Sequence, residues 1–135
     1  MATFRDSAHA ADFIGSFFRD EAVSGGKFFA GTGIIYAYVL TDLGVTVIID
    51  ASVKPQPGHN FNVFVNDPNA PKPTVEFIAT ADDFDRVYRG EAQPMALMMT
   101  GKIKTKGDVV AAMRTLPAMG VLIPHYKAYC AAHGR

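Results

Sequence analysis

The sequence contains no tryptophan, one cysteine and no long hydrophobic run. The single cysteine, Cys130, excludes an internal disulfide and fits a reducing compartment. The longest uninterrupted apolar segment, residues 34–40, is far shorter than the ~20 residues that a membrane-spanning helix needs. The amino-terminal segment carries an acid where a secretory signal has a basic start, and the final residues do not form a peroxisomal tripeptide. We therefore expect a cytoplasmic protein.

The chain also lacks an overall charge, since 13 lysines and arginines balance 13 acids. This balance, and tyrosines that are not interleaved with basic residues, argue against a nucleic-acid partner. With 49% hydrophobic and 19% charged residues, the composition fits one domain over 1–135. Residues 92–135 nevertheless hold six basic residues and one acid, Asp108. A solvated surface and a basic face that meets an anionic partner both fit this distribution.

Enzyme motifs are missing as well. A phosphate-binding loop needs a glycine five residues before its Gly-Lys pair and a serine or threonine after it. Gly101-Lys102 has Ala96 and Ile103 at these positions, and no Gly-x-Ser-x-Gly nucleophile elbow occurs. Cys130 and His133 stand three positions apart, but two groups do not complete a zinc site, so we expect no metal and no other cofactor. We assign no catalytic residue. A small enzyme that uses His125, Cys130 or the acidic cluster at 82–85 remains an alternative.

Hydrophobic periodicity in the first half predicts a helix followed by four strands. Asp6 is a suitable N-cap, and apolar residues recur behind it at helical spacing until residues 24–26 end the helix. We expect the four strands to form an antiparallel meander. Their β-branched and aromatic residues, separated by turn sequences, place them at 33–40, 45–52, 60–66 and 74–80.

Two short helices are predicted after the fourth strand. The first covers 82–90 and is capped by Asp82 or Asp83. The second covers 94–100, because proline is well tolerated in the first turn of a helix. At helical spacing, one apolar face of this second helix consists of Met95, Met98 and Met99.

A fifth strand and a broken helix complete the chain. Lysines alternate with other residues over 102–106, which predicts a strand, and Asp108 caps the helix that follows. Pro117 and Gly120 are expected to interrupt that helix, and a final one covers 121–133. The inward face of the interrupted helix is predicted to be Val109, Ala112, Met113 and Leu116.

Two residue types set the halves of the chain apart. All ten phenylalanines lie at or before Phe84, whereas every methionine after Met1 lies between Met95 and Met119. A methionine stripe is usually core, but this flexible side chain also lines adaptable apolar sites. The lysines of the fifth strand have two explanations, since they can protect an exposed sheet edge or meet a ligand or membrane.

The segment over 82–116 resembles the signature of the sterol carrier protein type 2 (SCP2) family. That signature has a short helix ending in glycine, a second short helix, and Gly-Lys-hydrophobic-Lys-x-Lys-Gly-Asp before a helix with a Met/Leu face. Thr105 stands where an aliphatic residue is usual, and Leu97 where phenylalanine is common. The residues that match are Gly90, Met98, Gly101, Lys102, Ile103, Lys104, Lys106, Gly107, Asp108, Met113 and Leu116.

The resemblance implies an α/β (α+β) fold, in which helices cover one face of a mixed, mostly antiparallel five-stranded sheet. An apolar tunnel between sheet and helices would then bind and transfer a fatty acid, an acyl-CoA, a sterol or another lipid without catalysis. Lys102, Lys104 and Lys106 are expected to contact the lipid headgroup or a membrane. The residues expected to line the tunnel are Phe13, Phe17, Phe84, Tyr88, Met95, Met98, Met99, Met113, Leu116, Leu122 and Tyr126.

An open tunnel would be costly in free energy. A dry, empty cavity of roughly 300 Å³ costs about 7 kcal/mol, which rivals the stability of a whole domain. Either side chains collapse into the space, as methionines readily do, or a lipid fills it. The same fold with a packed core, serving as an accessory domain for a partner enzyme, is a second alternative.

Overall fold

The computed structural model describes residues 4–24, 32–52 and 58–135. All five strands predicted from the sequence are present, whereas the predicted end of the first helix at 24–26 lies partly outside the described residues. The elements, in chain order, are α1 (Ser7–Ser24), β1 (Ile35–Leu40), β2 (Val45–Asp50), β3 (Asn62–Val65), β4 (Val75–Ala79), α2 (Ala81–Tyr88), α3 (Pro94–Met99), β5 (Lys104–Gly107) and α4 (Val109–Ala132).

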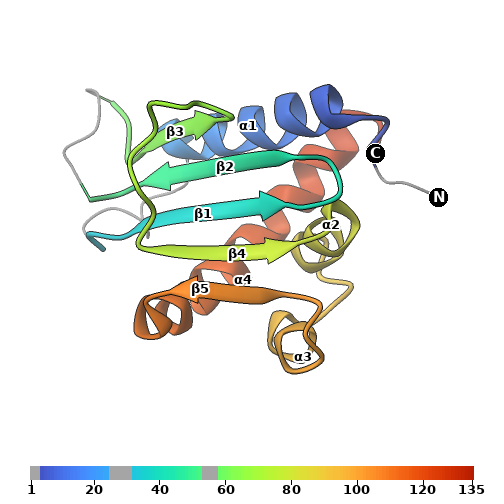
Figure 1. Cartoon of the computed structure of the whole chain (residues 1–135). Coiled ribbons are helices and arrows are strands. Elements are labelled where there is room, and N and C mark those ends of the chain that lie inside the picture. Colours follow the sequence, from blue (N-terminus) through green and yellow to red (C-terminus); the bar gives the residue numbers. More distant parts are fainter. Residues whose placement is uncertain (1–3, 25–31, 53–57) are drawn as a thin grey trace.

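The strands form one mixed sheet in the order β3-β2-β1-β4-β5 (Figure 1). β1 pairs antiparallel with β2 and parallel with β4, while the pairs β2–β3 and β4–β5 are antiparallel. The predicted mixed, mostly antiparallel sheet is confirmed. The expected meander of the first four strands is wrong, because the chain passes from β3 across β2 to the far side of β1 before it forms β4.

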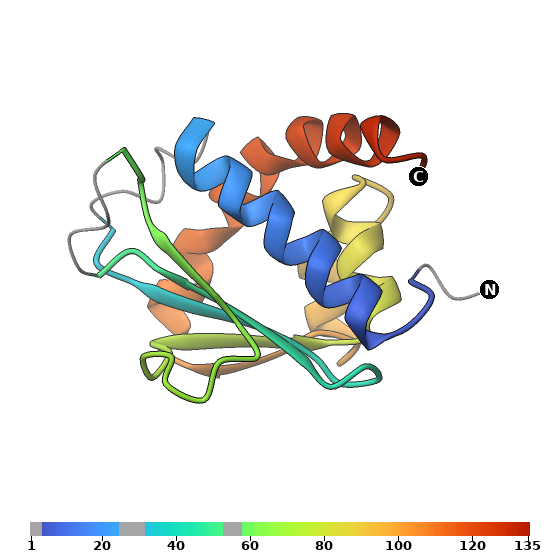
Figure 2. The same ribbon diagram turned by 90° about the horizontal axis from the view of Figure 1, so that it is seen from above.

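In the described part of the chain, the helices lie on one face of this sheet (Figure 2). α1 packs against β2 and β3, whereas α4 packs against β4, β5 and α2. Strand alternation explains the division of the side chains. Tyr36, Tyr38 and Leu40 are buried beneath the helices, while Ile35 and Val39 point to the uncovered face and are partly exposed.

The helix caps agree with the sequence at two of three positions. The Oδ1 of Asp6 accepts a hydrogen bond from the His9 amide at 2.8 Å, and the Oδ1 of Asp108 accepts one from the Ala111 amide at 3.1 Å. The prediction that Asp82 or Asp83 caps α2 is wrong. Thr80 is the N-cap, and its hydroxyl accepts from the Asp83 amide at 3.2 Å. Both aspartates lie in the first turn, where a carboxylate interacts favourably with the helix dipole.

Replacing Asp108 with alanine is expected to lower the free energy of unfolding by about 1 kcal/mol, because the first turn of α4 loses its cap. Replacement with asparagine, which caps a helix equally well, is expected to change it little. Urea denaturation of both variants measures the difference. Equal losses for alanine and asparagine would show that the side-chain cap contributes nothing.

α4 runs without a break from Val109 to Ala132, so the predicted interruption at Pro117 and Gly120 is wrong. A proline inside a helix removes one backbone hydrogen bond and bends the axis, and Figure 2 shows α4 changing direction in its middle. Pro117 and Pro124 lie on the exposed side of the helix. The carbonyls that they leave without an amide belong to Met113 and Gly120, four residues earlier, and both of these residues are exposed. Water is therefore available as a partner, and the helix continues.

Candidate apolar ligand site

An apolar pocket lies where the inner face of β1 and β4 meets α2, α3 and α4. Its volume is about 20 Å³. That is little more than the roughly 10–15 Å³ that one water molecule requires, so the side chains have closed most of the space. Of the states expected from the sequence, the structure therefore corresponds to the one in which side chains collapse into the space. The pocket is lined by Tyr38, Leu40, Phe77, Ala79, Phe84, Val87, Tyr88, Pro94, Met98, Ile103 and Leu116.

Aromatic rings form the floor of the pocket. Tyr38 stacks between Phe18 and Phe77, with ring centroids 5.5 and 5.8 Å away and interplanar angles of 13° and 22°. Phe84 and Tyr88 of α2 lie against each other at 4.7 Å. Such ring contacts add to the free energy gained by burying the rings, so they stabilise the floor of the pocket.

One polar feature belongs to this apolar lining. The hydroxyls of Tyr38 and Tyr88 are 2.6 Å apart and share a hydrogen bond. Burial raises the pKa of both phenols above their ordinary value, so both stay neutral at physiological pH. This hydrogen bond connects β1 to α2 within the lining of the pocket.

Replacing Tyr88 with phenylalanine is expected to cost about 1–3 kcal/mol, because it leaves the Tyr38 hydroxyl buried without its partner. The double variant, with phenylalanine at both positions, is expected to be no less stable than the single one, since it leaves no orphaned hydroxyl. Urea denaturation of Tyr38→Phe, Tyr88→Phe and the double variant gives the free energies for this double-mutant cycle. Costs that simply add would argue against the shared hydrogen bond.

The outer wall of the pocket is its adaptable side. Pro94, Met98 and Leu116 are partly exposed lining residues, so the pocket reaches solvent between α3 and α4. Within α3 only Leu97 is buried. The helix is held at its end by the amides of Lys102 and Ile103, which both donate to the Leu97 carbonyl oxygen, at 2.9 and 3.1 Å. A short helix with one anchoring side chain is a wall that can shift.

Four of the eleven residues predicted to line a tunnel lie together around this pocket. Phe84, Tyr88, Met98 and Leu116 border the pocket. Phe13, Phe17, Leu122 and Tyr126 do not, because they are buried in the part of the same core that lies between α1 and α4, where the Phe17 and Tyr126 rings are 5.1 Å apart.

The other three predicted lining residues lie at the surface. Met95, Met99 and Met113 are 43%, 83% and 44% exposed, and the inward position in α3 belongs to Leu97. The predicted inward face of α4 is also corrected, since Val109 is exposed while Ala111 and Ala112 are buried. Seven lining residues were not predicted. Alternation along the first and fourth strands was the available signal for four of them, Tyr38, Leu40, Phe77 and Ala79, and the other three are Val87, Pro94 and Ile103.

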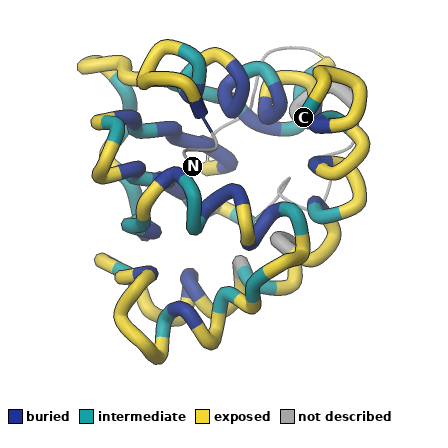
Figure 3. The backbone as a smooth tube through the Cα atoms, turned by 90° about the vertical axis from the view of Figure 1, so that its right-hand side faces the viewer, coloured by how far each residue is buried: buried dark blue, intermediate teal, exposed yellow. Residues whose placement is uncertain are grey.

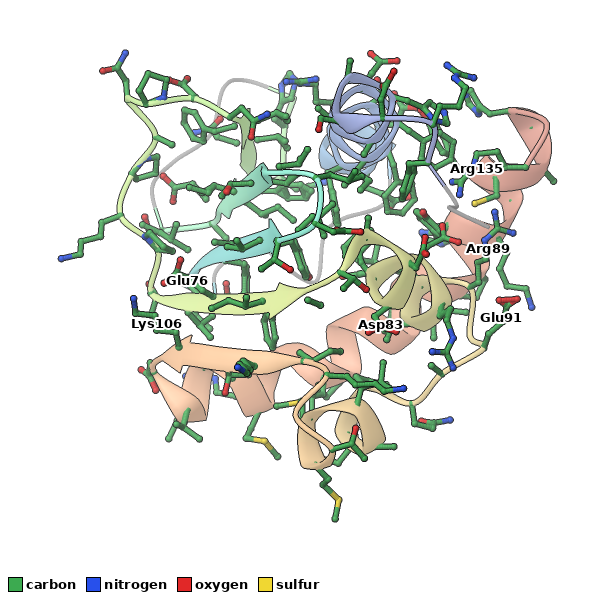
Figure 4. The ribbon with its side chains drawn as sticks, turned by 45° about the vertical axis from the view of Figure 1, so that its right-hand side comes forward. Glu76, Asp83, Arg89, Glu91, Lys106 and Arg135 are labelled. Carbon is green, nitrogen blue, oxygen red and sulfur yellow. The ribbon has the colours of Figure 1, made fainter. Side chains whose placement is uncertain are left out.

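The glycine-lysine segment forms the sheet edge beside the pocket. β5 is an edge strand, and Lys102, Lys104 and Lys106 are all exposed. Lys106 is the register partner of Glu76 on β4, and Figure 4 shows the two side by side. Gly107 has a φ of +100°, and a β-carbon there would collide with the Thr74 carbonyl oxygen, so the turn from β5 into α4 requires glycine.

A buried carboxylate ties α2 to the end of α4. The Oδ2 of Asp85 accepts from the Arg89 Nε at 2.7 Å, and its Oδ1 accepts from the Tyr126 hydroxyl at 2.6 Å and the Arg135 guanidinium at 3.2 Å. Figure 4 shows Arg89 and Arg135 converging beside α2. Burial, with the adjacent negative charge of Asp85, raises the pKa of Tyr126. This network fixes the position of α4 against α2, next to the pocket.

The residues of the alternative enzyme hypothesis do not converge. Cys130 is buried, and burial raises the pKa of its thiol, which disfavours the reactive thiolate. The Nδ1 of His125 lies 3.1 Å from a Glu21 carboxylate oxygen, and Asp83 pairs with Arg86. Over residues 4–24, 32–52 and 58–135, no three His, Cys, Asp or Glu side chains are placed to hold a metal ion.

A second hollow, of about 450 Å³, lies on the uncovered face of the sheet. Ile48 and Phe64 share its lining with Thr46, Asn66 and Asp67. Because it is open to water and partly polar, it offers an apolar chain less protection than the helix-covered pocket. We therefore assign the candidate ligand site to the pocket beneath α3 and α4.

A family comparison identifies this fold. Residues 17–119 match the model of the SCP-2 sterol transfer family, a span that contains every residue of the pocket lining. The chain belongs to this family. The resemblance seen in the sequence is thus confirmed, and SCP-2 membership places the chain among lipid- and sterol-binding domains.

Solved structures of SCP-2 domains share the fold. The sterol carrier protein domain 2 of Helicoverpa armigera is 17% identical, with a TM-score of 0.59, and the match covers 87% of each chain. A UbiJ-SCP2 ubiquinone synthesis protein is 14% identical, with a TM-score of 0.58, over 83% of this chain and 94% of that one.

A larger protein contains a similar unit. A variant of the sec-alkyl sulfatase PisA1 is 18% identical, with a TM-score of 0.53, over 73% of this chain. The match spans 15% of that protein's length. No curated protein sequence matches the chain. None of the described helices combines the length and apolar character needed to cross a bilayer.

Proposed function

We propose that this SCP-2 domain binds the apolar chain of a lipid in the pocket beneath α3 and α4 and transfers it without catalysis. The observation that supports this most is the pocket itself, which is enclosed by sheet and helices and lined almost wholly by hydrocarbon and aromatic side chains. Apolar lining with few polar groups is typical of sites for hydrophobic ligands. The lining lies entirely within the span that matches the family.

Binding requires the pocket to widen from about 20 Å³. Met98 is the lining side chain best suited to move, because methionine is unbranched and only partly buried here. Each methylene of the ligand that enters contributes about 0.8 kcal/mol, so ten contribute about 8 kcal/mol before the ordering of the chain is subtracted. That sum exceeds the cost of displacing one anchoring residue, Leu97, with its short helix.

The ligand classes that fit are fatty acids, acyl-CoAs, sterols and other lipids with a long apolar part. The Tyr38–Tyr88 hydroxyls already bond to each other, so a charged headgroup would find no counter-charge among the lining residues. We place the headgroup outside, near the exposed Lys102. Cytoplasmic location stays a prediction from the single cysteine.

The experiment is uptake of a fluorescent fatty acid by protein stripped of lipid, together with native mass spectrometry of the protein as purified. The proposal predicts saturable binding at micromolar concentration and a co-purified lipid mass that denaturation releases. A protein that is empty as purified and takes up no fatty acid would contradict it.

A second candidate function is an accessory domain with a closed core, which the small pocket volume favours. In that case a partner enzyme would be retained in pull-downs, and the protein would take up no lipid. The two candidates therefore give opposite results in the uptake experiment.

A further inference from the structure

We propose that the molecular edge formed by α3, β5 and the first half of α4 docks on an anionic lipid bilayer. This inference rests on the proposed function and names the surface through which the domain would contact the membrane that supplies its lipid. We call this edge the docking edge and define it by Met95, Met99, Lys102, Lys104, Val109, Val110, Met113 and Arg114. Figure 1 shows α3 and the start of α4 at the two ends of β5, and Figure 3 shows exposed residues along the same lower edge.

Exposed hydrophobic side chains are concentrated at this edge. Over residues 4–24, 32–52 and 58–135, every large hydrophobic side chain classed as exposed lies between Met95 and Val121. Met99 is 83% exposed, and Val109 and Val110 are 66% and 65% exposed. Single exposed hydrophobic residues need no explanation, but five of these six, all except Val121, belong to the docking edge, and such a grouping is typical of an interaction surface.

The first half of α4 is apolar on both sides. Its inner side buries Ala111 and Ala112 against the sheet, while Val109, Val110 and Met113 face water. Arg114 is the only charged residue from 109 to 124. A helix that is apolar all around is normally buried on all sides, so the outer side of α4 needs a covering surface.

The charges of the docking edge favour an anionic surface. Lys102, Lys104 and Arg114 are exposed, and none has an ion pair in the part of the chain that the structure describes. Lys106 lies opposite Glu76, and the one acid of this segment, Asp108, is engaged in capping α4. Apolar side chains flanked by unpaired cations are typical of surfaces that insert shallowly among anionic headgroups.

The docking edge also carries the mouth of the pocket. Pro94, Met98 and Leu116 belong to the same two helices and are the lining residues that reach solvent there. A lipid that leaves the bilayer at this edge would enter the pocket without its chain crossing water. A second copy of the chain is a poorer occupant, because a symmetric contact would bring the same cations together.

The test is sedimentation with vesicles of phosphatidylcholine alone or mixed with phosphatidylglycerol. We expect binding to the mixed vesicles that weakens at high salt, and little binding to phosphatidylcholine. Charge reversal by Lys104→Glu is expected to weaken binding at least about fivefold, the effect of one basic residue at an anionic surface. Val110→Asp, which removes an inserted side chain, is expected to weaken it by a similar factor.

Matched controls lie elsewhere on the chain. Lys72→Glu changes the net charge equally in the loop before β4, and Ala128→Asp adds the same acid to the exposed far half of α4. Both should bind vesicles like the wild type, and circular dichroism verifies that each variant is folded. Equal loss in controls and edge variants, or equal binding to both vesicle types, would overturn the docking edge.

Two further outcomes separate this inference from the proposed function. A wild-type protein that takes up fluorescent fatty acid in solution but ignores both vesicle types overturns the docking edge and leaves lipid binding standing. A protein that sediments with anionic vesicles but takes up no fatty acid supports the docking edge and contradicts the proposed ligand site. Analytical ultracentrifugation tests the remaining occupant. A dimer that Val110→Asp dissociates would identify a second copy of the chain as the partner of the docking edge and would overturn the proposal that a bilayer binds there.

Discussion

Replacing Asp85 with alanine is expected to lower the free energy of unfolding by about 3 kcal/mol, because it leaves two buried or half-buried guanidinium groups without their shared counter-charge. Asp85 is buried and accepts hydrogen bonds from Arg89, Tyr126 and Arg135. All three partners would lose their acceptor at once. The loss is measured by urea denaturation with the slope of the transition compared between variants.

Asp83 provides the matched control for this substitution. It lies two residues away on α2 and pairs with Arg86 at 3.2 Å, but the Arg86 side chain is 47% exposed, against 25% for Arg89 and 11% for Arg135. Water screens an ion pair whose cation is half exposed, so Asp83→Ala is expected to cost only about 1 kcal/mol. Similar costs at the two positions would show that the buried network does not hold α4 against α2.

Replacing Met98 with tryptophan is expected to reduce fatty acid affinity more than a hundredfold. The larger ring fills the space through which the pocket reaches solvent and is expected to exclude about four methylenes of the ligand. At about 0.8 kcal/mol each, their loss corresponds to about 3 kcal/mol. Fluorescent fatty acid titration without vesicles measures the change, and thermal unfolding confirms that the variant is folded.

The adjacent methionine offers a close control. Met99 is on the same helix but points to solvent, so Met99→Trp is expected to leave affinity in solution nearly unchanged. An equal reduction for both variants would indicate that the fatty acid binds on the outside of α3. Unchanged affinity for both would place the ligand somewhere other than this pocket.

The sequence predicted elements whose cause is local. The five strands and the caps at Asp6 and Asp108 depend on nearby residues, namely alternation along a strand and a side chain that reaches the next turn. The pairing of β4 with β1 depends on residues about forty positions apart, and no local pattern distinguishes it from a meander.

The ligand site was harder to predict, for a physical reason. α3 is apolar along its whole length, so periodicity cannot tell which side faces the core. The structure buries Leu97, places Met98 at the pocket and exposes Met95 and Met99, so only part of the expected inward face is inward. The prolines of α4 led to the wrong prediction of a break in the helix. A bent helix with these residues on its exposed side tolerates Pro117 and Pro124 inside it.

The pocket volume matches one of the two states anticipated from the sequence, the one in which side chains collapse into the space. A side-chain-filled space of about 20 Å³ matches collapse rather than an empty tunnel. Collapse removes the free-energy cost of a cavity. In the proposed function, the short helix α3 and the flexible side chain of Met98 are the parts of the wall that move when a ligand binds. In the proposed function the ligand replaces these side chains instead of entering a preformed hole.

The most direct test of this account is nuclear magnetic resonance of the protein labelled with carbon-13 at the methionine methyl groups, titrated with a fatty acid in the absence of vesicles. The account predicts that the Met98 methyl shifts and shows nuclear Overhauser effects to the methylenes of the ligand. Contacts confined to the exposed Met95 and Met99, or no contacts at saturating ligand, would contradict it.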